Sequence, residues 1–156
     1  MGSSVWANIS IPAGMIDDEV RKQLEEEGIK FADGIPQESQ SYVEVTLENG
    51  ILWLGNSETS YGEFTDLENL LILKGIPFER ETGLDFGYYP VRRVFRPGED
   101  GGAAFDHWFT LIDDEPVVSV KAIREVLSMG ITGAVESYLN EHFPTYPPLS
   151  DYVKEV

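Results

Sequence analysis

Hydrophobic residues follow two periods along this chain, one typical of strands and one typical of helices. Alternating apolar and polar positions predict seven short strands. They are Val5–Ile11, Ile29–Phe31, Tyr42–Glu48, Ile51–Glu58, Ile76–Glu81, Val91–Arg96 and Ala104–Ile112. Apolar residues spaced by three and four predict helices between these strands. The helices are Asp17–Glu27, Thr65–Lys74, Ser119–Met129 and a segment from Thr132 to Phe143.

Turn and capping residues mark the ends of several of these elements. Residues suited to the N-cap position stand at the start of each expected helix. They are Asp17 or Asp18, Thr65, Ser119 and Thr132. The four residues Thr65–Glu68 have the form of a capping box, and Asn49-Gly50 between two alternating segments predicts a β-hairpin. Prolines from Pro144 onward end the last helix, so the tail to Val156 is expected to run extended over the surface.

The tryptophans indicate an internal repeat. A Gly-Ile pair follows each of them 22 residues later. The pairs are Gly28-Ile29, Gly75-Ile76 and Gly130-Ile131, after Trp6, Trp53 and Trp108 respectively. A glycine just past the last turn supplies the left-handed residue that ends many helices. The spacing therefore predicts three repeats with the plan β-α-β-β, β-α-β-β and β-α-α, and coincidence of common helix-ending glycines is the alternative.

Together these elements predict an α+β fold with mostly antiparallel sheet and with helices packed on one face. Short connections and hairpins favour antiparallel pairing. The repeats would form three small modules of one compact unit, spanning residues 5–48, 51–96 and 104–156. The pattern leaves open whether these modules share one sheet.

The composition of the chain makes some classes of binding partner unfavourable. The 156 residues include 28 acids, 11 Lys or Arg and no cysteine, and the formal net charge is -17. No apolar run approaches the about 20 residues that span a bilayer. No basic segment leads into an apolar stretch as in a signal peptide, so a cytoplasmic location is expected. The acidity disfavours direct binding to nucleic acid or to an anionic membrane, because both require clustered Lys and Arg.

The common signatures of catalysis and of cofactor binding are missing from the sequence. Neither a phosphate-binding loop, nor a dinucleotide fingerprint, nor a nucleophile elbow occurs. The absence of cysteine excludes thiol nucleophiles and Cys-based metal sites, so no catalytic residue, cofactor or metal site is expected. His107 beside Asp106 is the exception and would suit a small enzyme. Because Phe105 and Phe109 share the strand face of His107, a packing role is favoured for this histidine.

Acidic and basic residues are distributed unevenly, which predicts a partner-binding surface. Residues 31–73 contain eight acids and no Lys or Arg, and residues 97–120 contain six acids and none. Alternate residues of a strand share a face, so Glu44 and Glu48 are expected side by side. The predicted acidic surface comprises Glu44, Glu48, Glu58, Glu63, Asp66, Glu68, Asp113, Asp114 and Glu115. A further triplet, Glu25–Glu27, ends a helix, where the helix dipole disfavours negative charge. Solubility is the alternative explanation for the acidity.

Size, acidity, absence of cysteine and tandem small α/β modules resemble the anti-restriction and anti-CRISPR proteins of phages and plasmids, some of which mimic DNA. The resemblance lies in the plan of the whole chain and in no sequence motif, so it transfers no functional residues. It implies a stoichiometric inhibitor without a cofactor, which binds the basic nucleic-acid-binding surface of a bacterial defence complex or nuclease. An immunity protein or antitoxin for a nuclease toxin fits the same electrostatics. The sequence is also compatible with a phage structural protein or with a small enzyme that uses His107 and Asp106.

Overall fold

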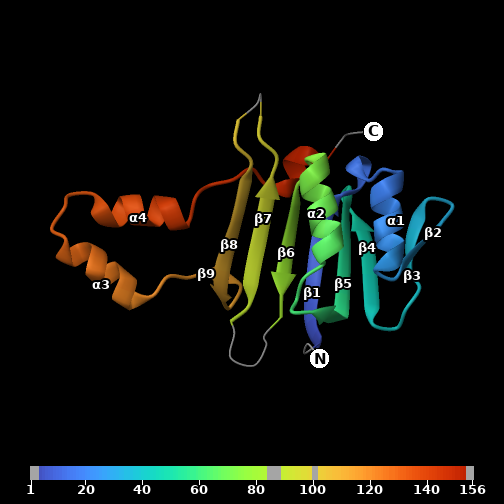
Figure 1. The fold of residues 1–156 in the computed structure, drawn as a ribbon, viewed down its shortest axis with the longest axis horizontal. Helices are drawn as coiled ribbons and strands as arrows, with labels where there is room; N and C mark the ends of the chain where they lie inside the picture. Colours follow the sequence, from blue (N-terminus) through green and yellow to red (C-terminus); the bar gives the residue numbers. More distant parts are fainter. Residues whose placement is uncertain (1–3, 84–88, 100–101, 154–156) are drawn as a thin grey trace.

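The computed structural model describes residues 4–83, 89–99 and 102–153, which form a seven-stranded antiparallel sheet with helices (Figure 1). The sheet strands are β1 (Ser4–Pro12), β4 (Val43–Glu48), β5 (Ile51–Ser60), β6 (Phe78–Thr82), β7 (Val91–Arg96), β8 (Phe105–Ile112) and β9 (Glu115–Pro116). Their order across the sheet is β4-β5-β1-β6-β7-β8-β9. A separate two-stranded sheet consists of β2 (Ile29–Ala32) and β3 (Ile35–Glu38). The helices are α1 (Asp18–Glu26), α2 (Thr65–Lys74), α3 (Val120–Ser128) and α4 (Ala134–His142), with 3-10 turns η1 (Ala13–Met15) and η2 (Leu149–Tyr152).

The predicted α+β class and antiparallel pairing are confirmed, and the main core lies between the sheet and two helices. α1 and α2 lie on the same face of the sheet (Figure 1). Ile9 of β1 and Leu54 of β5 are fully buried in one cluster with Leu24 of α1 and Leu71 of α2. Burial of apolar surface stabilises by about 25 cal/mol per Å², so this cluster is the main source of stability for the fold.

Strands from all three expected modules pair within the large sheet. β5 lies between β4 and β1, β6 pairs with β1 on its other side, and β8 pairs with β7. The predicted hairpin across Asn49-Gly50 is present, with positive φ at both turn residues. β3 and β9 occupy segments in which no strand was predicted.

The threefold repeat is not confirmed, because the third helix is placed differently from the first two. Gly28, Gly75 and Gly130 follow α1, α2 and α3 with φ of 103°, 67° and 64°, as helix-ending glycines do. α1 and α2 contact each other on the sheet. α3 instead contacts α4, and both helices lie beyond β8, clear of the sheet (Figure 1). Helix packing on one face is therefore correct for α1 and α2 and wrong for α3 and α4.

The structure confirms two of the predicted N-cap residues. The side chains of Asp17 and Ser119 each accept a backbone hydrogen bond of 3.0 Å at the starts of α1 and α3. The N-cap of α4 is Gly133 in a left-handed conformation, and Thr132 is not the cap as predicted. No helix in the described part of the chain is long and apolar enough to cross a bilayer.

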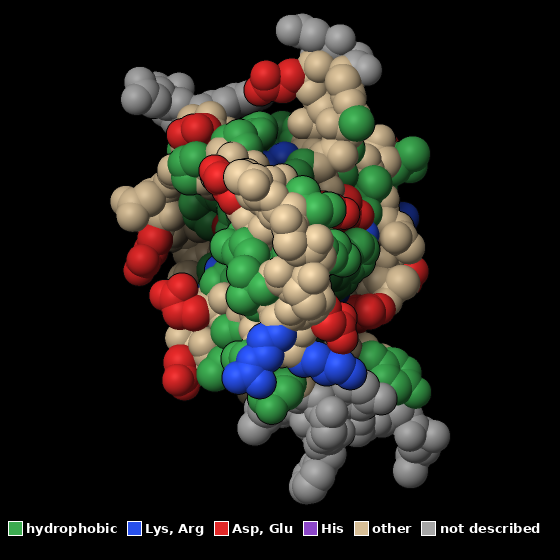
Figure 2. All heavy atoms as spheres, turned by 90° about the vertical axis from the view of Figure 1, so that its left-hand side faces the viewer, with side chains coloured by type: hydrophobic (Ala, Val, Ile, Leu, Met, Phe, Trp, Pro, Cys, Tyr) green, Lys and Arg blue, Asp and Glu red, His purple; other side chains and the backbone are tan. Residues whose placement is uncertain are grey.

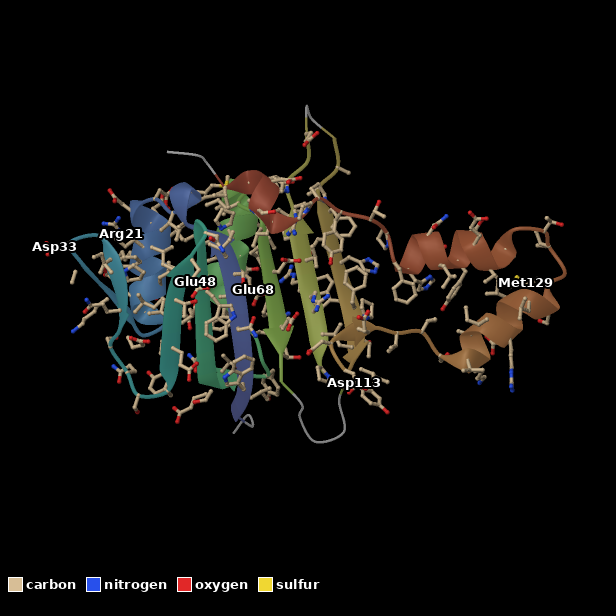
Figure 3. The ribbon with its side chains drawn as sticks, turned by 180° about the vertical axis from the view of Figure 1, so that it is seen from behind. Arg21, Asp33, Glu48, Glu68, Asp113 and Met129 are labelled. Carbon is tan, nitrogen blue, oxygen red and sulfur yellow. The ribbon has the colours of Figure 1, made fainter. Side chains whose placement is uncertain are left out.

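The tail after α4 packs on the sheet face opposite α1 and α2, and it does not run extended throughout. Phe143 and Tyr146 pack against a second buried cluster that contains Val94 and Phe109. The chain then forms η2, whose Leu149 is buried. This tail covers the β7–β8 side of the face, and it then reaches one end of the β4–β6 side, where η2 contacts β1 and Val153 lies against Gly50. The rest of the β4–β6 side remains open (Figure 3).

Candidate functional site

The face of β4, β5, β1 and β6 that points away from α1 and α2 is here called the open sheet face (Figure 3). Side chains alternate between the two faces of a strand, so the strand register fixes its members. They are Trp6, Asn8, Ser10 and Pro12 on β1, Glu44, Thr46 and Glu48 on β4, Ile51, Trp53 and Gly55 on β5, and Glu79 and Glu81 on β6. The face therefore combines two tryptophans with four carboxylates.

Trp6 and Trp53 form an aromatic pair on the open sheet face. Their ring centroids are 6.1 Å apart, with an interplanar angle of 42°, which is within the range of favourable aromatic contacts. A Cβ at Gly55 would fall 2.6 Å from the Trp53 ring, so glycine at this position makes room for the indole. The Trp6 side chain remains 41% exposed. Exposed tryptophan of this kind is enriched in protein interfaces.

The carboxylates on the two sides of this tryptophan pair differ in their partners. On β6, both acids pair with arginines of β7, and Glu81 accepts a hydrogen bond from Arg92 Nε at 2.6 Å. On β4, Glu44 and Glu48 are exposed and make no ion pair with any residue in the described part of the chain. Within the described residues, the carboxylates of the open sheet face that lack an ion-pair partner therefore lie along β4.

Five basic residues are held in ion pairs with acids of the same chain, so few basic side chains are left to offset the other acids. They are Lys74, Arg80, Arg92, Arg93 and Arg96. Arg80 and Arg96 are each only 2% exposed. The planar, multiply donating guanidinium of arginine suits such inward roles. A partner approaching the open sheet face therefore meets carboxylates whose charge few surface cations offset.

Three of the predicted surface acids lie at the end of the sheet where β5 finishes. Glu58 is exposed on β5, Glu63 lies in the following loop, and Asp66 lies in the first turn of α2. Antiparallel pairing places Glu44, near the start of β4, at this same end of the sheet. The structure therefore brings these acids to one end of the sheet and places Glu48 at the other end of the same strand.

Glu68 was predicted to belong to the acidic surface, and this prediction is wrong. The side chain lies beneath α2 and the residue is 1% exposed. Its Oε1 accepts hydrogen bonds from Arg80 Nε at 2.8 Å and Arg93 Nη1 at 3.1 Å. Its Oε2 accepts the backbone N–H of Phe64 at 2.7 Å, and Phe64 is the N-cap residue of α2 in place of Thr65. Two arginines from strands distant in sequence thus convert an expected surface acid into a buried ion pair.

The triplet Asp113, Asp114 and Glu115 is separated from the other predicted acids. It forms the turn from β8 to β9 at the far side of the sheet (Figure 3), with φ of 51° at Asp113 and 63° at Asp114. Four strand spacings, about 19 Å, separate β5 from β8. The triplet therefore lies apart from the exposed acids of β4, β5 and the start of α2, and the predicted acids do not form one continuous surface.

Glu27 is an acid that the predicted surface omits, and it lies near the start of α2. Burial raises the pKa of Glu27, and the nearby charges of Asp66, Glu26 and Glu68 raise it further. The sequence did contain a signal for this site, because the triplet Glu25–Glu27 ends a helix where the dipole disfavours carboxylates. Like charges and burial at this position cost stability at neutral pH.

His107 and Asp106 cannot act together, because they project from opposite faces of β8. Asp106 accepts a hydrogen bond from Arg93 at 2.8 Å on the face that carries α2. On the other face, His107 Nε2 lies 3.0 Å from the carbonyl oxygen of His142. The His107 ring also contacts Phe109, with centroids 4.6 Å apart. These contacts give His107 the packing role that its neighbours on the strand favoured.

No known family, characterised protein or solved structure matches the chain. Among the residues that the structure describes, no group of three or more His, Asp or Glu is placed to hold a metal ion. The candidate site therefore rests on the geometry of the open sheet face, where exposed Trp6 and half-buried Trp53 lie beside carboxylates that make no ion pair with any described residue. Sequence reasoning predicted the carboxylates of β4 and missed the tryptophan pair.

Proposed function

We propose that this protein is an acidic inhibitor, which binds the basic nucleic-acid-binding surface of a bacterial defence complex or nuclease in the cytoplasm, without a cofactor. The observation that supports this proposal is the open sheet face, where Glu44 and Glu48 lie on the same side as Trp6 and Trp53 and make no ion pair within residues 4–83, 89–99 and 102–153. Surfaces that bind nucleic acid present Lys and Arg to phosphates. Carboxylates accept hydrogen bonds from the same donors, so this face is chemically complementary to such a surface.

The tryptophans add a second means of recognising arginine. A guanidinium placed over an indole ring is attracted by the electrons of the ring. The chain contains an example of this contact, because Arg93 Cζ lies 4.3 Å from the Trp108 ring centroid. Tryptophan is also enriched among the residues that contribute most to binding energy. In our proposal Trp6 and Trp53 anchor the partner, while the carboxylates guide its approach.

The proposed contact extends past the open sheet face. A standard interface buries about 800 Å² on each partner, which is a large area for one side of four short strands. Glu58, Glu63 and Asp66 lie at the adjoining end of the sheet and would enlarge the acidic contact. Asp113–Glu115 would join only if the partner is wide enough to reach across the sheet.

Capture from a bacterial lysate, followed by competition against nucleic acid, tests the proposal. The test variant carries Glu44→Lys, Glu48→Lys and Glu58→Lys. The matched control carries Glu25→Lys, Glu26→Lys and Glu99→Lys, all at exposed positions away from the open sheet face. Both variants change the net charge equally, so a difference between them reports the position of the charge and not its amount.

The expected result has three parts. The wild-type chain captures a nucleic-acid-binding protein and displaces labelled DNA or RNA from it. The test variant associates about tenfold more slowly at low salt, because long-range attraction is lost, and the difference shrinks as salt screens the charges. The control variant associates as wild type does. The proposal fails if the test variant binds as fast as wild type at low salt, or if the partner holds nucleic acid and this chain together.

A further inference from the structure

The helices α3 and α4 and the turn between them form an arm, which stands out from the sheet beyond β8 (Figures 1 and 2). Val126, at 9% exposed, is the one buried side chain in these two helices. Val120, Leu127, Met129 and Ile131 are each 61–67% exposed. Figure 2 views the arm end-on, with hydrophobic side chains exposed on the side that faces the viewer. The arm therefore exposes apolar side chains that soluble proteins usually cover.

The apolar residues of α3 form one stripe along the helix, and basic residues lie beside it. Val120, Ile123 and Leu127 recur at helical spacing and form one apolar stripe. Arg124, four residues after Val120, lies at the edge of this stripe, and Lys121 lies further toward the polar side. α4 covers only part of the apolar side, because Ile123 is half-buried while Val120 and Leu127 remain exposed. One neighbouring helix is therefore not enough to bury the apolar side of α3.

Helices of this length need further packing to be stable. Isolated helices shorter than about 12–15 residues are marginal in water, and tertiary packing supplies most helical stability in proteins. α3 and α4 have nine residues each, and only Val126 is buried between them. We propose that the arm of a second copy of this chain covers the exposed stripe, so that two chains form a dimer through a bundle of four helices.

The charges of the arm favour a second copy as the occupant. α3 contains Lys121, Arg124 and Glu125, so it is net positive, whereas α4 contains Glu136 and Glu141 and is net negative. A twofold contact uses the same patch on both chains. α3 of one chain can therefore lie along α4 of its partner, and opposite charges meet twice. The arm has a net charge of -1 within a chain of -17, so repulsion between two copies is weakest here.

The exposed area is also consistent with a missing contact. The chain exposes 9,934 Å², whereas a folded monomer of 17.5 kDa exposes about 7,900 Å². The projecting arm is one reason for this excess. A stable interface of standard size buries about 800 Å² on each partner, so covering the arm brings the exposed area closer to the usual value.

The mass of the purified chain in solution tests the proposal. Sedimentation equilibrium or light scattering is measured across about two decades of protein concentration in the micromolar range, where interfaces of this size begin to form. Wild type is expected at twice the chain mass of 17.5 kDa. Leu127→Glu places a charge in the stripe and should weaken the dimer about a hundredfold, which is observed as a monomer.

Two further variants keep the interpretation specific. Leu73→Glu changes another exposed leucine, at 84% exposed on α2, and should leave the dimer intact. Arg124→Glu reverses an exposed charge at the edge of the apolar stripe of α3, and it should weaken the dimer more at low salt than at high salt. Circular dichroism checks that each variant is folded.

Three outcomes overturn the proposal: a monomeric wild type throughout the concentration range, a dimer that survives Leu127→Glu, or an equal loss of the dimer in Leu73→Glu. The first of these outcomes includes a monomer whose arm binds an unrelated protein. The measurement uses no partner, so its result is independent of the function proposed for the open sheet face.

Discussion

The large sheet together with α1 and α2 is called the body. The helices of the body and those of the α3–α4 arm are similar in length, but they are buried to different degrees. α1 and α2 bury leucines such as Leu24 and Leu71 completely, whereas the arm buries only Val126. Yet α3 separates its apolar and polar residues clearly along the sequence. The comparison shows that a helical period predicts an apolar side, and that it does not predict which surface covers that side.

The position of the preceding strand explains the difference. β1 and β5, which precede α1 and α2, lie within the sheet with strands on both sides. A helix that turns back from such a strand finds a broad apolar face to cover. α3 follows β9, the last strand in the sheet order. The chain leaving this edge runs away from the sheet, so α3 finds only α4.

The largest expected effect concerns the buried charge in the body. Glu68→Ala should lower the free energy of unfolding by about 3–5 kcal/mol, because the change leaves Arg80 buried without its partner. On the arm, the exposed acid Glu125 provides the comparison, and Glu125→Ala should change stability by no more than about 0.5 kcal/mol. Denaturant unfolding of both variants measures the difference. Equal losses would show that the body and the arm do not differ as described.

Substituting one leucine in the body and one in the arm tests the same difference in burial without changing a charge. Leu71→Ala should cost about 2–5 kcal/mol, because it leaves a cavity in the main core. Leu127→Ala removes an exposed side chain and should cost less than about 0.5 kcal/mol when unfolding is measured at a protein concentration too low for dimers. A large loss at Leu127 under these conditions would show that the body covers the arm in solution.

Substituting the glycines that end α2 and α3 distinguishes a loss of stability in the whole body from local unfolding of the arm. Gly75 and Gly130 have similar left-handed conformations, with φ of 67° and 64°, so alanine at either position costs about 1–2 kcal/mol. Gly75→Ala should lower the stability of the whole body in denaturant unfolding. Gly130→Ala should leave that stability unchanged and speed amide hydrogen exchange within α3 and α4. Faster amide hydrogen exchange throughout the body in Gly130→Ala would show that the body and the arm do not unfold independently.

The smallest expected effect depends on pH. The pKa of Glu27 is raised above its ordinary value of 4.5, chiefly by burial. The folded state therefore holds this proton more tightly than the unfolded state, and stability is lost as the pH rises from about 4.5 through the folded pKa. Glu27→Gln removes this loss, so it should raise the thermal midpoint at pH 7 and should lose its advantage below about pH 4.

Glu125→Gln, on the arm, is the control for the change in net charge. Its thermal midpoint should differ little from wild type at either pH. If Glu27→Gln were equally stabilising at pH 3 and pH 7, its effect would come from packing and not from the ionised carboxylate.

Local elements of the fold could be predicted because they depend on neighbouring residues. The Asn49-Gly50 hairpin forms because both residues tolerate positive φ. The side chain of Asp17 caps α1, and Gly75 ends α2, by contacts within one turn of each residue. Alternation along β4 also placed Glu44 and Glu48 on one face correctly. None of these features requires knowledge of a distant segment.

The candidate site depends on contacts that no local pattern contains. Trp6 and Trp53 meet only because β1 pairs with β5 in one register. Glu68 is buried only because Arg80 and Arg93 arrive from β6 and β7. Each contact joins residues far apart along the chain, so residue type and spacing could not predict it.

The sequence by itself determined the α+β class, most of the strand and helix positions, and an excess of exposed carboxylates, since side-chain period and charge are local properties. Only the tertiary structure decided which acids remain on the surface, that two tryptophans share the open sheet face, and that α3 leaves the sheet with α4. The physical reason is that burial and pairing depend on which segments become neighbours. That choice follows from the strand order and register of the whole sheet, which no short segment specifies.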